Sequence, residues 1–256
     1  IPDPDKQEED GPWNGIIAGA GSRISISGAK FDGATTAISG APSYLRISGC
    51  TFIGCDNAVS VSACNDLRIV SNTFTGNGSG IAVSVTQSGG YINNNTITGY
   101  YKGINVMSCS PTLVQNTIND CFLNGLYVAG NNTYMSMVNP IQIGGTIKSG
   151  DELGIDNSEL NNTLHNNGID YVPPPYMISK ASQIYMVSNS NIYLAKGWNN
   201  IYSDANQVPC IRTIGLIPEG EPIRMQLINA RENFWGYGTI NDSFFALSLP
   251  YYIDYS

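Results

Sequence analysis

The sequence has few charged residues, a single histidine and no long apolar run, and each shortage excludes a class of protein. Charged residues make up 12% of the 256-residue chain, about half of the usual share. One histidine, His165, nearly excludes His-based metal sites and Ser-His-Asp triads. No segment approaches the roughly 18 apolar residues of a membrane helix, so we expect no membrane span.

Basic residues are also scarce. Lys and Arg total 12 against 20 Asp and Glu, which gives a net charge of -8 and a pI near 4.5. Binding of nucleic acid phosphates needs a basic surface, so we expect no nucleic acid partner. No signal peptide is recognisable, which indicates a cytosolic, an already processed or an excerpted chain.

The chain does contain a repeat of about 22 residues, marked by apolar positions that recur in three columns. The first column is Ile16, Ile38, Val59, Ile81, Ile104 and Leu126. The second is Ile26, Ile47, Ile69, Ile92 and Leu113. The third follows five residues after the second, at Phe31, Phe52, Phe74, Ile97 and Ile118. Columns that keep their phase over five copies indicate a solenoid repeat.

Each copy contains three short apolar segments separated by Gly, Asn or Asp. Their alternation, with β-branched and aromatic residues, predicts strands. Three strands in about 22 residues form one coil of an all-β solenoid, whose coils stack about 4.8 Å apart. Asn72, Asn95 and Asn116 fall at the bend between the second and third strands. We expect them to adopt the left-handed backbone conformation there and to hydrogen-bond along their column.

The chain resembles the right-handed parallel β-helix proteins of the pectate-lyase-like superfamily, of the secreted bacterial type. The resemblance is carried by residues 67–76 (LRIVSNTFTG), 80–83 (GIAV) and 13–16 (WNGI), and near the end by 228–230 (INA) and 232–236 (ENFWG). It implies a right-handed parallel β-helix. It does not identify a reaction, because this fold hosts lyases, hydrolases, epimerases, adhesins and tailspikes.

The sequence divides into an entry segment and one domain. Residues 1–12 are acidic and proline-rich, which indicates a linker or an extended entry segment. Residues 13–256 are expected to form one β-helix domain of roughly eight to ten coils. We expect regular coils over 13–128, irregular coils with a lateral loop over 129–179, and final coils with a cap containing Trp235 over 180–256. Because an open solenoid end exposes strand edges, we expect the domain to belong to a longer chain.

The six cysteines are predicted to be free, mostly buried thiols. They are Cys50, Cys55, Cys64, Cys109, Cys121 and Cys210. Cys55 and Cys121 share a turn position three coils apart, about 14 Å, and Cys64 and Cys109 lie two coils apart, about 10 Å. Both separations exceed the roughly 7 Å between Cα atoms that a disulfide allows.

Groups for acid or base catalysis are missing from the regular coils. The outward residues expected on the first strand are Ser39, Ser60, Ala82, Asn105 and Tyr127, and none serves as a general acid or base near neutral pH. The carboxylates of these coils each lie in a different coil. The paired aspartates and Gly-His-Gly of the polygalacturonases are absent, as is the Asp-Pro-His-Glu of the mannuronan epimerases. We therefore assign no catalytic residue.

Two candidate sites remain in and beside the loop region. Four carboxylates within nine residues could bind calcium through oxygen ligands, although their spacing matches no calcium loop and a solvated acidic loop is the favoured interpretation: Asp151, Glu152, Asp156 and Glu159. No other cofactor is expected. Tyrosine rings suit stacking against sugars, which makes a second group the predicted glycan site: Tyr100, Tyr101, Lys102, Asn105 and Tyr127.

Two further outward columns are predicted. Arg46 and Arg68 lie in neighbouring coils on the second strand, where they could hold an anionic sugar or simply be solvated beside Asp66. The other column is made of threonines on the third strand, an arrangement also found in ice-binding solenoids: Thr51, Thr73, Thr96 and Thr117.

Three functions are compatible with these observations. The first is a non-catalytic, secreted or cell-surface module that binds polysaccharide or surface glycan, or that acts as an adhesive stalk. The second is a polysaccharide lyase or glycoside hydrolase with a non-standard site near residues 100–165. The third is a structural unit that stacks end to end in a larger chain or filament.

Overall fold

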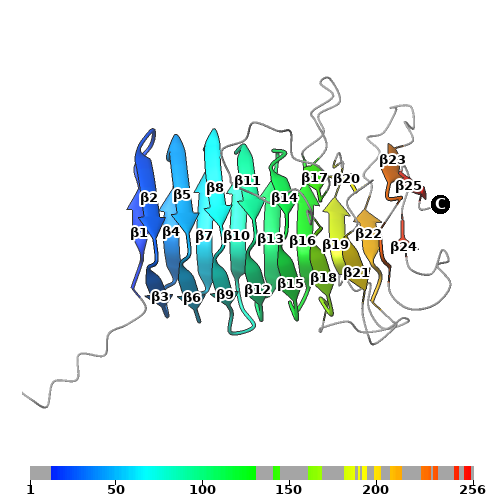
Figure 1. The fold of residues 1–256 in the computed structure, drawn as a ribbon, viewed down its shortest axis with the longest axis horizontal. Coiled ribbons are helices and arrows are strands. Elements are labelled where there is room, and N and C mark those ends of the chain that lie inside the picture. The colour runs from blue at the N-terminus through cyan, green and yellow to red at the C-terminus, as the bar shows by residue number, and fades with distance from the viewer. Residues whose placement is uncertain are drawn as a thin grey trace, which may run out of the picture.

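A computed structural model describes residues 13–130, 141–144, 161–168, 182–187, 190, 192–194, 199–202, 208–214, 226–231, 233–235, 245–247 and 251–254. These residues form strands and turns and contain no helix, so none of them belongs to a helix that could cross a membrane. Three parallel sheets run along a rod (Figure 1), and the coils from β1 to β21 each contribute one strand to each sheet in turn. The predicted three-stranded parallel solenoid is thus confirmed.

The strands of the three sheets follow the repeat. Sheet A consists of β1 (Ile16–Ala18), β4 (Thr36–Gly40), β7 (Asn57–Ser62), β10 (Ile81–Thr86), β13 (Lys102–Met107), β16 (Asn124–Ala129), β19 (Ser182–Val187), β22 (Ile211–Ile214) and β24 (Phe245–Ala246). Sheet B consists of β2 (Arg23–Ser27), β5 (Tyr44–Ser48), β8 (Asp66–Val70), β11 (Gly90–Asn93), β14 (Thr112–Val114), β17 (Ile141–Ile143) and β20 (Ile192–Tyr193). Sheet C consists of β3 (Lys30–Asp32), β6 (Thr51–Ile53), β9 (Thr73–Thr75), β12 (Thr96–Thr98), β15 (Thr117–Asn119), β18 (Thr163–His165) and β21 (Asn200–Tyr202). A separate pair joins β23 (Gln226–Asn229) to β25 (Tyr251–Asp254).

The strand register confirms two of the three predicted columns and corrects the first. The second column stacks as predicted from Ile26 to Leu113, and the third stacks as predicted from Phe31 to Ile118. In sheet A, however, Val59 pairs with Val83, and Ile81 pairs with Asn57. The turn before β10 is therefore two residues longer than a uniform repeat predicts. A two-residue shift keeps the alternation of faces, so the apolar pattern could not reveal it.

One long coil links β16 to β19. Leu126 pairs directly with Ile184, so no strand of sheet A lies between them. Within the stretch predicted as irregular, β17 joins sheet B and β18 joins sheet C. Residues 1–12 lie outside the described part of the chain.

The asparagine column forms a continuous hydrogen-bonded ladder inside the rod. The Nδ2 of Asn72 donates to Oδ1 of Asn95 at 3.0 Å, and Asn95 donates to Asn116 at the same distance. The ladder continues through Asn162, Asn199 and Asn233.

The ladder asparagines also satisfy main-chain groups. Each Oδ1 accepts the amide of the previous member, as Asn95 does from Asn72 at 3.0 Å. The left-handed backbone, however, belongs to the preceding residue, such as Ser71 (φ 56°) or Asn94 (φ 53°). The predicted hydrogen bonding along the column is confirmed, and the predicted left-handed conformation of these asparagines is wrong.

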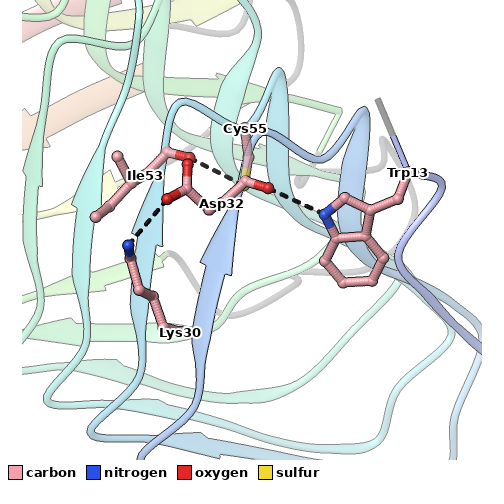
Figure 2. Close-up of polar contacts among 5 residues, drawn as sticks. All are labelled: Trp13, Lys30, Asp32, Ile53 and Cys55. Atoms are coloured by element: carbon pink, nitrogen blue, oxygen red, sulfur yellow. Dashed lines mark hydrogen bonds and ion pairs between the residues drawn. The ribbon is translucent and has the colours of Figure 1, made fainter. Parts of the chain in front are cut away.

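An aromatic stack fills the first coils of the core. Phe31, Phe52 and Phe74 lie with ring centroids 4.7 Å apart and nearly parallel planes. Trp13 extends the stack by lying 6.1 Å from Phe31. Figure 2 shows that its Nε1 also donates to the main-chain oxygen of Asp32 at 3.0 Å, beside the ion pair of Asp32 with Lys30 at 2.9 Å. The indole therefore closes the stack at the first coil.

Near the far end of the described rod, Trp235 is packed against the last coils. Trp235 is 2% exposed and meets Phe245 edge to face at 5.1 Å. Asn233 donates to the carbonyls of Leu194 and Ala230, which ties this segment to the last coils.

Candidate functional site

The outward side chains of sheet A form one column along the rod, which we call the polar row. It consists of Ser39, Ser60, Ser84, Asn105, Tyr127, Tyr185 and Arg212. The prediction placed Ala82 in this column, but Ala82 is fully buried and the longer turn puts Ser84 there. The first four members are uncharged hydrogen-bonding groups, so this half of the face can donate and accept without carrying a charge.

Asn105 marks the change from small to aromatic side chains in the polar row. Its Nδ2 donates to Oγ of Ser84 at 2.9 Å, and its side chain is 5% exposed. The amide is thereby fixed in orientation by its neighbour in the previous coil. Asn105 acts as a positioned part of the row rather than a freely exposed ligand group.

Lys102, Tyr127 and Tyr185 stack beyond Asn105. The Nζ of Lys102 lies 3.8 Å from the centroid of the Tyr127 ring. On its other side, Tyr127 stacks on Tyr185 with centroids 5.6 Å apart. Burial raises the pKa of both phenols, so both stay protonated at neutral pH. The two faces of the Tyr127 ring are covered, so a sugar reaches its edge and hydroxyl and not its face.

Arg212 is the last member of the polar row and its one charged side chain. Its Nε is buried and has no hydrogen-bond partner. It follows Tyr185 directly in the register and lowers that phenol's pKa, against the larger effect of burial. A buried guanidinium N–H without an acceptor costs free energy.

The other predicted glycan-site residues separate into core and surface. Tyr100 is fully buried, and its hydroxyl has no hydrogen-bond partner. The chain turns this ring inward over Gly76, where an added Cβ would lie 2.7 Å from it. Tyr101, the next residue, is 39% exposed. The structure thus groups Lys102, Asn105 and Tyr127 on one face and removes Tyr100 from it.

The predicted calcium ligands Asp151, Glu152, Asp156 and Glu159 lie outside the described residues. Within the described part, no group of three or more His, Cys, Asp or Glu side chains could hold a metal ion. All six cysteines are free and buried, as predicted. His165 lies on sheet C, stacked on Tyr202 at 4.3 Å, and is not part of the polar row.

Three members of the polar row were missed in the sequence, namely Ser84, Tyr185 and Arg212. Ser84 was hidden by the two-residue shift before β10. Tyr185 had a local signal, because residues 184–186 (IYM) repeat the pattern of residues 126–128 (LYV). The intervals between these copies are far from 22 residues, so periodicity alone could not align them.

Comparison with known proteins agrees with this architecture. A family model described as the right-handed beta helix region matches residues 9–141, just over half of the chain. No curated protein and no solved structure matches the sequence.

Proposed function

Because the chain belongs to the family of right-handed beta helix regions, we propose that it is a non-catalytic module that binds polysaccharide along the outer face of sheet A. The proposal includes a secreted or cell-surface location, because extended polysaccharides are mostly met outside the cell. It also includes a surface glycan or a cell-wall polymer as the partner.

One observation carries this proposal, the continuous polar row. Ser39, Ser60 and Ser84 stand in successive coils, about 4.8 Å apart. A row of hydroxyl groups at a regular rise suits a chain of repeating sugar units, whose hydroxyls pair with it along its length. Lys102 lies beside the row and Arg212 belongs to it. Both can donate hydrogen bonds to a ring oxygen, a hydroxyl or a carboxylate of the sugar.

The chemistry of the row supports binding over catalysis. No Asp, Glu or His belongs to it, and Lys102 lies with its ammonium against the Tyr127 ring. General acid and base steps need a group that exchanges a proton near neutral pH. The raised pKa values of Tyr127 and Tyr185 move those phenols away from that range.

The test is a glycan array with the full chain, followed by calorimetry on the polysaccharides that bind. Ser60→Phe places a bulky side chain between Ser39 and Ser84 in the row without entering the core. We expect it to weaken binding on the order of tenfold, because polymer contacts on both sides are lost. Thr73→Phe, on the exposed outer face of sheet C, is the matched control and should leave affinity unchanged.

Two outcomes would count against the proposal. An array without any bound glycan would remove the binding function, and equal loss in both variants would move the site off sheet A. Release of reducing ends or of unsaturated uronate from a bound polymer would instead make the chain an enzyme.

A further inference from the structure

A second outer face, on sheet B, concentrates positive charge. Arg23 lies on β2, Arg46 on β5 and Arg68 on β8, three strands that lie side by side in the first half of the rod (Figure 1). These are three of the seven Lys and Arg residues that the structure describes, whereas one of its five Asp residues, Asp66, lies on this face. The chain as a whole carries a net charge of -8.

The three guanidinium groups are differently engaged. Arg68 donates from Nε to Oδ1 of Asp66 at 3.0 Å. Arg23 lies over the Tyr44 ring, 4.4 Å from its centroid. Arg46 is exposed and makes no hydrogen bond or ion pair with any described residue. The one carboxylate of the face is thus already used by Arg68.

The register places two of these charges directly beside each other. Arg46 pairs with Arg68 in the neighbouring coil, and Tyr91 follows Arg68 in the same column. Like charges on adjacent strands repel, and this repulsion lowers the stability of the protein without a bound anion. A carboxylate or sulfate between them would offset the repulsion and accept bidentate hydrogen bonds from the planar guanidinium groups.

We propose that the outer face of sheet B binds an anionic polysaccharide through Arg46 and Arg68, with Arg23 as the third contact. The ligand class is a carboxylated or sulfated glycan, because Arg46 and Arg68 stand one coil rise apart and Arg23 lies in the neighbouring column of Tyr44 and Asp66. A linear polymer with regularly spaced acidic groups satisfies that geometry. This site is separate from the polar row on sheet A and does not depend on it.

The experiment measures binding of the full chain to dextran sulfate by calorimetry, with neutral dextran beside it. Arg46→Gln removes one positive charge from sheet B. Lys30→Gln removes the same charge from sheet C at the same end of the rod, which controls for net charge. We expect Arg46→Gln to weaken dextran sulfate binding about fivefold and Lys30→Gln to weaken it less than about twofold at moderate salt.

A stability measurement provides a second readout. Without polyanion, Arg46→Gln should raise the melting temperature slightly, because the repulsion with Arg68 is removed, and Arg46→Lys should not. In the Ser60→Phe background, where the sheet A row is blocked, Arg46→Gln should still weaken dextran sulfate binding by the same factor, which separates this site from the one on sheet A.

Several results would overturn the proposal. These are no binding of dextran sulfate, equal weakening by Arg46→Gln and Lys30→Gln, or equal affinity for neutral dextran. Tighter, Arg46-dependent binding of a single-stranded oligonucleotide of matched charge would assign the face to a nucleic acid instead.

Discussion

Tyr100 shows how one residue can look functional in the sequence and be structural in the fold. It stands beside Tyr101 and Lys102, in the pattern of a sugar-binding surface. The structure places its ring in the core, where burial raises the pKa of its hydroxyl far above the ordinary value. The neighbouring buried thiols of Cys55 and Cys121 add to that rise in smaller measure.

The buried hydroxyl of Tyr100 gives a direct prediction. Because it has no hydrogen-bond partner, Tyr100→Phe should remove a desolvation cost and raise the free energy of unfolding by about 1 kcal/mol. Urea unfolding measures the change, and glycan binding should stay as in the unmodified chain. Tyr101→Phe, on the half-exposed neighbour, is the control and should change neither. A loss of stability in Tyr100→Phe would show that its hydroxyl has a partner in solution.

At the scale of elements, the asparagine ladder ties one turn of the β-helix to the next. Asn95 accepts from the amide and the side chain of Asn72, and donates to Ile69 O and Asn116. Replacing it leaves several buried polar groups without partners at once. Such a network is worth more than one isolated hydrogen bond.

We therefore expect Asn95→Ala to lower the free energy of unfolding by about 2 to 4 kcal/mol. Asn94→Gly is the matched control one residue earlier, because Asn94 is exposed and has φ 53°. Glycine adopts this conformation without strain, so that variant should change stability by less than about 1 kcal/mol. Urea unfolding of both proteins gives the comparison. Equal effects would show that the ladder adds nothing beyond local turn geometry.

The elements were predictable from the sequence to different degrees, for physical reasons. The phenylalanines of β3, β6 and β9 fix the phase of sheet C, because large rings stack in one register only. Sheet A offers Ile81, Val83 and Val85 in alternation, and any of them can face the core. Short glycine-rich turns therefore decide the register, and apolar periodicity does not report their length. The same limit hid Ser84 from the predicted site.

At the scale of the whole molecule, buried thiols run along the rod from Cys50 to Cys210. Burial raises the pKa of Cys121 and of Cys210 to about 12, from 9.0. Below pH 9 the thiols are protonated in the folded and in the unfolded protein, so burying them as neutral groups carries no ionisation penalty and stability is at its full value. Between pH 9 and 12 only the unfolded thiols ionise, so stability falls as pH rises.

Between pH 9 and 12 we expect the free energy of unfolding to fall by about 1.4 kcal/mol per pH unit for each such thiol. Urea unfolding of the reduced protein from neutral pH to pH 10.5 would measure it. In Cys121→Ala the free energy of unfolding should fall less steeply above pH 9, by the contribution of one thiol. The variant is less stable at neutral pH. Parallel curves for the two proteins would contradict the raised pKa.

The overall architecture was the most predictable feature, and the outer surfaces were the least. A repeat of apolar columns specifies the inside of a solenoid, because every coil repeats the same contacts. The outward positions carry no such constraint, so Tyr185 and Arg212 could be assigned to the polar row only by strand register. The predicted threonine column on sheet C is confirmed by the register, whereas end-to-end stacking, a calcium loop and an ice-binding role for the threonines stay predictions.

Among the regular coils, each added coil lengthens the rod by the same rise, so the number of coils sets its length. The segment from Asn95 up to Asn116 is one complete turn, bounded at both ends by the same ladder position. Duplicating or deleting such a turn changes the rod by one rise, about 4.8 Å, and leaves the remaining faces in register. An added turn would lengthen both outer faces together, and with them the length of polymer that each face could contact.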